Sequence, residues 1–280
     1  TVTLTTTSPF GCSDTFSDQI EVFANTVAGS IGGATTLCVD DASVNSLTLS
    51  GQTGNVLRWE RSVTGTDQWI PIETTATSID YSELGQTTFY RALVQNGVCN
   101  EVFTSNVRIQ IDEKSQGGTL EGSTSVCDDG NSGSITLGDN IGTIQSWIFS
   151  TTSADGPWTN IANISSTQSY TNLTTTTHYR SVVRNGVCAN DTSEVATVTV
   201  FPATVSGLLS SSATVCTSDN MGTLNLSGNT GDILRWESSP TANGPWTTID
   251  NETNSLFYDD LVETTYYRAV VKSGVCNEVN

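Results

Sequence analysis

The 280-residue sequence predicts an all-β protein made of tandem immunoglobulin-like or fibronectin-III-like β-sandwich domains in a head-to-tail array. Three observations support this prediction: a repeat of about 89 residues, short segments of alternating apolar and polar residues, and Asn-Gly or Ser-Gly turns between apolar runs. A unit of this length fits one small sandwich and exceeds the short solenoid repeats. No segment shows the 3.6-residue periodicity of an amphipathic helix.

Cysteine and tryptophan residues mark the repeat. The first cysteines of successive repeats are 89 residues apart, and the second cysteines are 89 and 88 residues apart. These series, together with the tryptophan between them, are Cys38, Cys127 and Cys216; Cys99, Cys188 and Cys276; and Trp59, Trp147 and Trp236. We therefore divide the chain into a closing hairpin of a preceding domain, residues 1–24, and repeats at 25–112, 113–201 and 202–280. We expect the third repeat to lack most of its last strand.

The first repeat illustrates the expected strands. Residues 46–50 ("SLTLS") alternate as a strand, and residues 51–54 form a turn. Residues 56–60 ("VLRWE") form the next strand, with Leu57 and Trp59 on one face and Val56 and Arg58 on the other. A short strand at 69–72 contains Pro71, which suits a sheet edge. Strands at 87–95 and 98–111 form the final hairpin around the Asn-Gly turn.

Aromatic residues recur at fixed places in each repeat. The mid-strand tryptophans, Trp59, Trp147 and Trp236, are predicted core residues. A tyrosine near the start of the penultimate strand occupies the tyrosine-corner position, where its hydroxyl bonds back to the backbone; a plain core tyrosine is the alternative. These tyrosines are Tyr90, Tyr179 and Tyr267. A second tryptophan, at Trp69, Trp158 and Trp246, is expected to pack over the sheet edge, although stacking on sugar rings is also open.

Seven cysteines in a β-rich chain indicate an oxidising, extracytoplasmic compartment, and none forms the tight pairs typical of zinc sites. The end of the first strand and the final hairpin of a sandwich lie at opposite poles, roughly 25–30 Å apart. A disulfide requires Cα atoms within about 7 Å. This geometry favours pairing between neighbouring repeats, Cys38 with Cys188 and Cys127 with Cys276. Pairing within repeats stays open if the first strand switches sheets: Cys38–Cys99, Cys127–Cys188 and Cys216–Cys276. Cys12 is expected to pair outside this chain.

The composition argues against several functions. A formal charge of -19 is unsuited to nucleic acid or an anionic membrane, and no apolar run is long enough to insert in a bilayer. The one histidine, His178, aligns with Phe89 and Tyr266, so we expect a structural role and predict no catalytic or cofactor-binding residue. The loop at 127–133 is a weak calcium candidate, with a solvated turn as the alternative. Its oxygen ligands would be Asp128, Asp129 and Asn131.

The segments "RWE", "TTFYRALVQNGVC" and "TTYYRAVVKSGVC", with a cysteine before "LTLSG", resemble immunoglobulin-like repeats of Bacteroidota cell-surface adhesins. The SprB-type gliding-motility adhesins, which are type IX secretion substrates, carry such repeats. The resemblance covers residues 24–280, whereas residues 1–24 resemble the end of a PKD-type domain. It implies a structural or adhesive segment of an extracellular filament, not an enzyme. Its partners would be neighbouring repeats, the outer-membrane secretion or motility machinery, and a surface or glycan ligand. Accessory or carbohydrate-binding modules of a secreted multidomain enzyme are the alternative.

Overall fold

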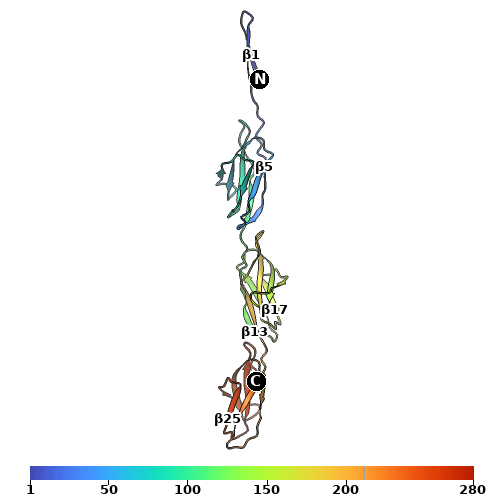
Figure 1. Ribbon diagram of the computed structural model, residues 1–280, viewed down its shortest axis with the longest axis vertical. Coiled ribbons are helices and arrows are strands. Elements are labelled where there is room, and N and C mark those ends of the chain that lie inside the picture. Colours follow the sequence, from blue (N-terminus) through green and yellow to red (C-terminus); the bar gives the residue numbers. More distant parts are fainter. Residues whose placement is uncertain (211) are drawn as a thin grey trace. The chain divides into compact units, whose positions relative to one another are not determined.

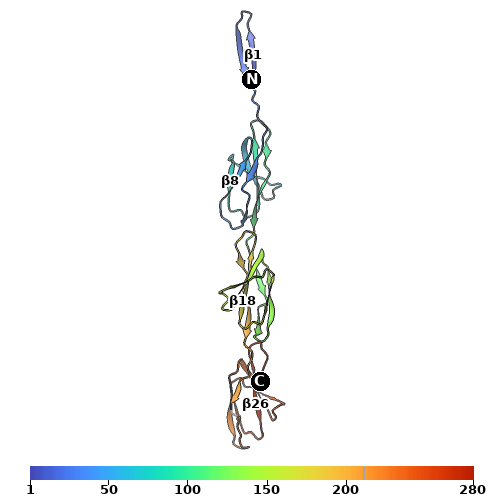
Figure 2. The same ribbon diagram turned by 90° about the vertical axis from the view of Figure 1, so that its right-hand side faces the viewer.

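The computed structural model describes residues 1–210 and 212–280, and within these residues it contains strands and turns but no helix (Figures 1 and 2). The chain forms two compact units. The first consists of residues 1–114 together with the hairpin tip 186–188, and the second consists of residues 115–185 and 189–280. The first unit therefore holds the N-terminal hairpin and the first repeat, and the second unit holds most of the other two repeats.

The first repeat is a sandwich of two sheets (Figure 1). The smaller sheet has the strand order β3 (Ser30–Gly32), β5 (Asn45–Ser50), β8 (Ser78–Tyr81). The larger sheet has the order β4 (Thr36–Cys38), β11 (Val107–Asp112), β9 (Thr88–Gln95), β6 (Asn55–Ser62), β7 (Ile70–Ile72), and β10 (Val102–Phe103) also pairs with β9. This division of strands is that of immunoglobulin-like and fibronectin-III-like sandwiches.

The second repeat has the same arrangement. Its sheets are β12 (Thr119–Glu121), β14 (Ser132–Gly138), β17 (Thr167–Thr171), and β13 (Thr124–Cys127), β20 (Ala196–Phe201), β18 (Thr177–Arg184), β15 (Thr143–Ser150), β16 (Thr159–Ile161), with β19 (Asp191–Thr192) beside β18. The third repeat has β21 (Leu208–Ser210), β22 (Met221–Ser227), β25 (Ser255–Asp259), and β24 (Thr247–Ile249), β23 (Asp232–Ser239), β26 (Tyr266–Lys272). The N-terminal hairpin is β1 (Val2–Thr7) with β2 (Ser13–Asp18).

The first strand of the first two sandwiches switches sheets. In the first repeat, β3 pairs with β5 in one sheet, whereas β4 runs parallel to β11 in the other. The register places Cys38 opposite Asp112, the last residue of β11. Because β9 is antiparallel to β11, the end of β9 at Gln95 lies at the other pole. Cys38 therefore lies at the pole where the chain leaves the repeat, away from the repeat's own final turn.

The core of each repeat is built around its mid-strand tryptophan, as predicted. Trp59, Trp147 and Trp236 are fully buried, at 0% exposure. In each, the indole N–H donates a 2.9 Å hydrogen bond to a backbone carbonyl oxygen in the loop that leads into β8, β17 or β25; the acceptors belong to Ala76, Ser165 and Thr253. The ring supplies a large buried apolar area while its one polar atom is satisfied, which is the usual condition for burying tryptophan.

The predicted alternation in residues 56–60 is wrong at Val56. Val56 and Trp59 are both buried, although an unbroken strand would place them on opposite faces. The cause is a β-bulge: Val56 pairs with Val94 and Arg58 pairs with Leu93, so Leu57 is the extra residue. The final strand is also interrupted, because residues 98–111 contain two separate strands, β10 and β11.

The recurrent tyrosines lie in the core but do not form the expected corner. Within the described residues, the Tyr90, Tyr179 and Tyr267 hydroxyls make no hydrogen bond to the backbone. Instead each ring packs against a second tyrosine, with centroids 6.0, 6.4 and 6.3 Å apart; the pairs are Tyr81–Tyr90, Tyr170–Tyr179 and Tyr258–Tyr267. Burial raises the pKa of Tyr179 to about 12. These residues are therefore core tyrosines arranged as ring pairs.

Candidate functional site

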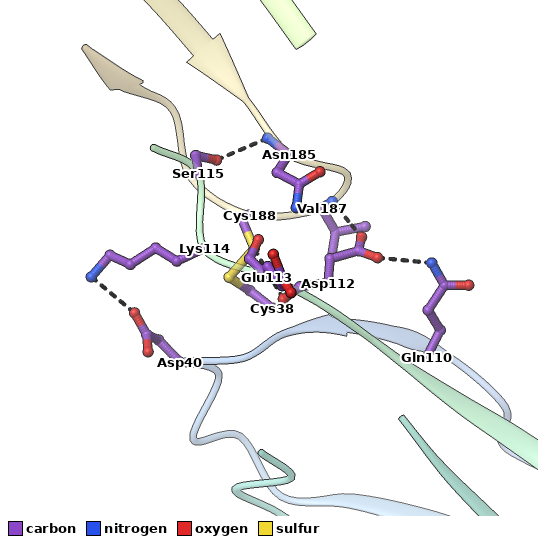
Figure 3. Close-up of a disulfide and its surroundings, with 10 residues drawn as sticks. All are labelled: Cys38, Asp40, Gln110, Asp112, Glu113, Lys114, Ser115, Asn185, Val187 and Cys188. Atoms are coloured by element: carbon purple, nitrogen blue, oxygen red, sulfur yellow. Dashed lines mark hydrogen bonds and ion pairs between the residues drawn. A yellow bond between two sulfur atoms is a disulfide. The ribbon is translucent and has the colours of Figure 1, made fainter. Parts of the chain in front are cut away.

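The cystines join cysteines of different repeats. Cys38 is bonded to Cys188 with a Cα–Cα distance of 4.9 Å, and Cys127 is bonded to Cys276 at 5.1 Å (Figure 3 for the first). Both distances lie within the normal range for disulfides. The pairing within repeats that the sequence left open, such as Cys38–Cys99, is not formed. Despite the sheet switch, the first-strand cysteine thus pairs with the final turn of the following repeat.

The register explains where each first-strand cysteine lies. Cys38 ends β4 opposite Asp112, and Cys127 ends β13 opposite Phe201. Asp112 and Phe201 are the last residues of the final strands, just before the chain passes to the next repeat. The final-turn cysteines are almost completely covered, Cys188 at 1% and Cys276 at 4% exposure. Their partners Cys38 and Cys127 are partly exposed.

The turn that carries Cys188 is held by Asp112 (Figure 3). One carboxylate oxygen of Asp112 accepts a 3.1 Å hydrogen bond from the Val187 N–H, and the other accepts one of 2.8 Å from the Gln110 side-chain amide. Gly186 has a φ of 50°, and a Cβ there would lie 1.8 Å from the Asp112 carboxylate. The glycine of the "NGVC" segment is therefore required both for its backbone conformation and for close approach to the carboxylate.

In every repeat, the first residue of this turn donates a backbone hydrogen bond to a serine or threonine hydroxyl. The backbone N–H of Asn185 donates to Ser115 Oγ at 2.9 Å. The corresponding hydrogen bonds, each 3.1 Å, run from Asn96 to Thr26 and from Ser273 to Thr204. Ser115 and Thr204 each lie three residues beyond the end of the preceding strand, and Thr26 lies eight residues beyond it. This recurrent hydrogen bond ties the final turn of a repeat to the start of the same repeat.

Cys12, Cys99 and Cys216 have no disulfide partner within the described part of the chain. The Cys99 thiol donates to the carbonyl oxygen of Ala24 at 3.3 Å. The sulfur of Cys188 lies in a similar position, 3.1 Å from the carbonyl oxygen of Glu113. Cys99 is therefore placed like the bonded turn cysteines.

The side chain of Asn131, one of the three weak calcium candidates, is hydrogen-bonded to the backbone around its loop. The Asn131 side-chain amide donates 2.7 Å hydrogen bonds to the carbonyl oxygens of Cys127 and Leu173, and its Oδ1 accepts the Leu173 N–H at 2.9 Å. Asn220 makes the corresponding bonds to Cys216 and Leu261. Asn131 is thus fully engaged in fixing the loop. Among the residues that the structure describes, no group of three His, Cys, Asp or Glu side chains, Asp128 and Asp129 included, could hold a metal ion.

The second tryptophan of each repeat packs on an arginine. Arg91 lies between two rings, 4.0 Å from the Trp69 centroid and 3.9 Å from that of Phe103. Arg268 lies 4.1 Å from Trp246, and Arg180 lies 5.4 Å from Trp158. The expected packing role is therefore present, but the sequence analysis missed its cationic partner. The signal was the "YR" pair in each penultimate strand, which becomes informative only once the strand register is known.

Carboxylates complete these stacks in two repeats. Glu60 binds Arg58 and Arg91 through its two oxygens, at 2.8 and 2.7 Å. Glu237 binds Arg235 and Arg268 in the same way, at 2.8 and 2.6 Å. Burial opposes ionisation of Glu237, but the hydrogen bonds from Arg235 and Arg268 prevail and lower its pKa.

His178 lies apart from these stacks and hydrogen bonds to Thr197 Oγ1 at 2.9 Å through its Nδ1.

Fold and cystines together define a chain of tandem immunoglobulin-like and fibronectin-III-like β-sandwich repeats, covalently linked from one repeat to the next. The chain belongs to the family described as "Domain of unknown function (DUF8696)", whose model matches residues 27–113, 116–202 and 205–280. Within the described residues, no helix is long and apolar enough to cross a membrane.

The solved structures that resemble this chain include the two that follow. The crystal structure of chicken CNTN1 FN1-FN3 domains is 13% identical, with 89% of this chain and 94% of that chain covered and a TM-score of 0.33. A marsupial T cell receptor is 12% identical, with 86% and 99% covered and a TM-score of 0.42. No curated protein sequence matches this chain.

Proposed function

We propose that this chain is a structural and adhesive segment of a large extracellular adhesin or filament, and that its cystines limit how far it extends under tension. Surface attachment or gliding motility is the setting that the sequence resemblance favours. Neighbouring repeats and an outer-membrane secretion or motility machinery would be its partners. The two cystines support an oxidising, extracellular location. We propose a mechanical role for the chain and no enzymatic one.

The observation that carries this proposal is the overlap of the two cystines along the sequence. Cys127 lies inside the segment closed by Cys38 and Cys188, and Cys188 lies inside the segment closed by Cys127 and Cys276. The shortest covalent route from Thr1 to Asn280 therefore follows the chain to Cys38, crosses to Cys188, returns to Cys127 and crosses to Cys276. Interlocked bonds of this kind restrain an unfolded chain more than either bond alone.

The restraint has a measurable size. The route uses roughly 100 peptide steps, which at about 3.5 Å each give a limiting extension of about 360 Å. The reduced chain extends to about 980 Å by the same estimate. The fold and its cystines would thus act at different stages: the sandwiches resist unfolding, and the covalent route limits extension once they unfold.

Single-molecule pulling from the two termini tests this proposal. The oxidised chain is expected to reach a final contour length of about 360 Å, and reduction is expected to lengthen it to about 980 Å. Removing either cystine, as Cys38→Ser/Cys188→Ser or Cys127→Ser/Cys276→Ser, should give about 450 Å, because the remaining bond still bypasses more than half of the chain. Cys99→Ser serves as the control and should change nothing.

The cystine-deleted variants distinguish the two possible pairings. If the bonds lay within repeats, each double substitution would break two of three bonds and leave about 770 Å, far above the 450 Å expected here.

Surface location is a separate test. Antibodies against this chain should label intact source cells, and labelling that requires cell lysis would contradict the extracellular assignment.

A further inference from the structure

We propose that the first repeat has a binding site for a neutral oligosaccharide, in a groove beside the edge strand β7. The groove has a volume of about 530 Å³ and is lined by residues that include Arg61, Gln68, Trp69, Ile70, Glu83 and Gln86. This volume is within the range of small-molecule sites, about 300–1,000 Å³. All of these residues belong to the first compact unit.

A second groove extends the first along the edge of the sheet. It has a volume of about 460 Å³ and shares Arg61, Ile70 and Leu84 with the first. Pro71 and Ile72 of β7 line its continuation. Two adjoining hollows along one strand suit a linear ligand of several units better than a single compact molecule.

The side chains at the first groove are available for hydrogen bonding. In the part of the chain that the structure describes, the side chains of Arg61, Gln68, Glu83 and Gln86 make no hydrogen bond or ion pair. Together they offer guanidinium and amide donors and carboxylate and amide acceptors. Trp69 adds an aromatic ring to the lining. A ring surrounded by planar polar groups matches a pyranose, which has an apolar C–H face and a rim of hydroxyls.

Charge selects a neutral ligand. Arg91 already lies over the Trp69 ring at 4.0 Å, so a ligand cation at this ring would be repelled. A polyanion is disfavoured by Glu83 in the groove and by the chain's formal charge of -19. A polyhydroxyl ligand satisfies both the donors and the acceptors without adding charge.

The first and second repeats differ at this groove. Strand register aligns Arg61 with Phe149 and Ser238, since these residues pair with Tyr90, Tyr179 and Tyr267. In the second repeat, Phe149 packs against the core, and the remaining hollow of about 270 Å³ is largely apolar. Replacing this phenylalanine by Arg61 therefore gives the first repeat a larger hollow with a polar rim.

Backbone conformation gives an independent indication. Gln68 and Glu83 have φ values of 53° and 49°, in the left-handed region. The residues that align with Glu83 are Asn172 and Asp260, and asparagine and aspartate tolerate this conformation best. Backbone preference therefore does not explain a glutamate at this position. Unfavourable conformations of this kind concentrate at binding sites, where the side chain contributes to recognition.

The test uses the full chain and a fixed set of probes: the hexasaccharides of cellulose, xylan, mannan and chitin as neutral ligands, with hexagalacturonate and the chitosan hexamer as charged ones. Binding is measured by isothermal titration calorimetry and localised by amide chemical shifts. We expect at least one neutral hexasaccharide to bind with a dissociation constant below about 1 mM, or about -4 kcal/mol. The chemical-shift changes should be confined to the two grooves.

Two substitutions separate binding from folding. Glu83→Asn introduces the residue of the second repeat, and Arg61→Ser introduces that of the third. Each should weaken binding at least tenfold, while Glu83→Asn leaves the melting temperature unchanged or raises it. Asp260→Asn in the third repeat is the matched control and should preserve affinity. Absence of binding by every neutral probe, binding only of a charged probe, or affinity unchanged by both substitutions would overturn the proposal. Purified protein suffices, so the outcome does not depend on the mechanical role proposed above.

Discussion

The first and second repeats have the same core and the same kind of cystine, yet they differ on the outer face of the larger sheet. In the first repeat, Glu60 lies between Arg58 and Arg91. In the second, Ile148 occupies the position of Glu60, as its pairing with Arg180 shows. The buried tryptophan and the cystine are therefore common to both repeats. The ion pairs of a glutamate with two arginines, here called the carboxylate network, occur in the first repeat and not in the second.

In the second repeat, a backbone carbonyl oxygen takes part of the role that the Glu60 carboxylate has in the first. Arg180 donates from Nη1 to the Ser193 carbonyl oxygen at 3.0 Å. Its Nε is buried without a hydrogen-bond partner among the described residues. An unsatisfied buried donor costs about 1–3 kcal/mol. Ile148 offsets this cost, since burying an apolar side chain avoids the desolvation of a carboxylate.

The largest expected effect probes the shared core. Trp59→Ala and Trp147→Ala should each destabilise its own repeat by about 3–5 kcal/mol, because each removes a fully buried ring and leaves a cavity. Hydrogen exchange resolved by repeat measures the change in the mutated sandwich. Costs that differ by more than a factor of two would show that the two cores are not equivalent. Trp158→Ala, at the partly exposed second tryptophan, is the control and should cost less.

The second prediction compares the outer faces of the larger sheets in the first and second repeats. Glu60→Gln should destabilise the first repeat by about 2 kcal/mol, because it weakens two charge-assisted hydrogen bonds and leaves two arginines without a counter-charge. The matched change Ile148→Gln should cost less, since no ion pair is lost. Chemical denaturation followed by hydrogen exchange compares both variants. Equal costs would mean that the network in the first repeat contributes no more than apolar packing does.

Much of the fold was predictable because it follows from local patterns. Alternation located the strands, and the position of Trp59 in mid-strand predicted its burial. The distance between the poles of a sandwich favoured Cys38–Cys188 over Cys38–Cys99, and the structure has the former. The β-bulge at Leu57 was not predictable, because one extra residue in an apolar strand leaves the local pattern unchanged.

Side-chain contacts between different strands could not be predicted from the sequence. The ion pair of Glu60 with Arg91 depends on the register between β6 and β9, which are 31 residues apart at this point. Asn131 looked like a possible metal ligand because its amide chemistry suits either role, and only the positions of Cys127 and Leu173 decide between them. The groove at Arg61 likewise requires knowledge of which loops meet.

A smaller effect concerns acid stability of the third repeat. The pKa of Glu237 is lowered from its ordinary value of 4.5. A lowered folded-state pKa contributes stability that is present above pH 4.5 and is lost as the pH falls through the folded-state pKa. Glu237→Gln should therefore remove the part of the stability loss on acidification that this carboxylate contributes. Thermal unfolding between pH 6 and pH 3 measures this difference. Parallel pH profiles for the two proteins would contradict the assignment.

The smallest effect would convert the second repeat to the pattern of the first. Ile148 is half-buried directly across from Arg180, so Ile148→Glu places a carboxylate where Glu60 and Glu237 lie in the other repeats. The new carboxylate would accept a hydrogen bond from the unpartnered Nε of Arg180. Both Ile148→Glu and Ile148→Gln lose the apolar burial of isoleucine, but only the glutamate gains an ion pair. We therefore expect Ile148→Glu to be more stable than Ile148→Gln by about 0.5 kcal/mol at pH 7. Protonating the glutamate should abolish the difference below about pH 4. If the two variants are equally stable at pH 7, the network needs its second arginine. The position of Arg58 is held by Ser146 here, and Ser146→Arg combined with Ile148→Glu should then restore the difference.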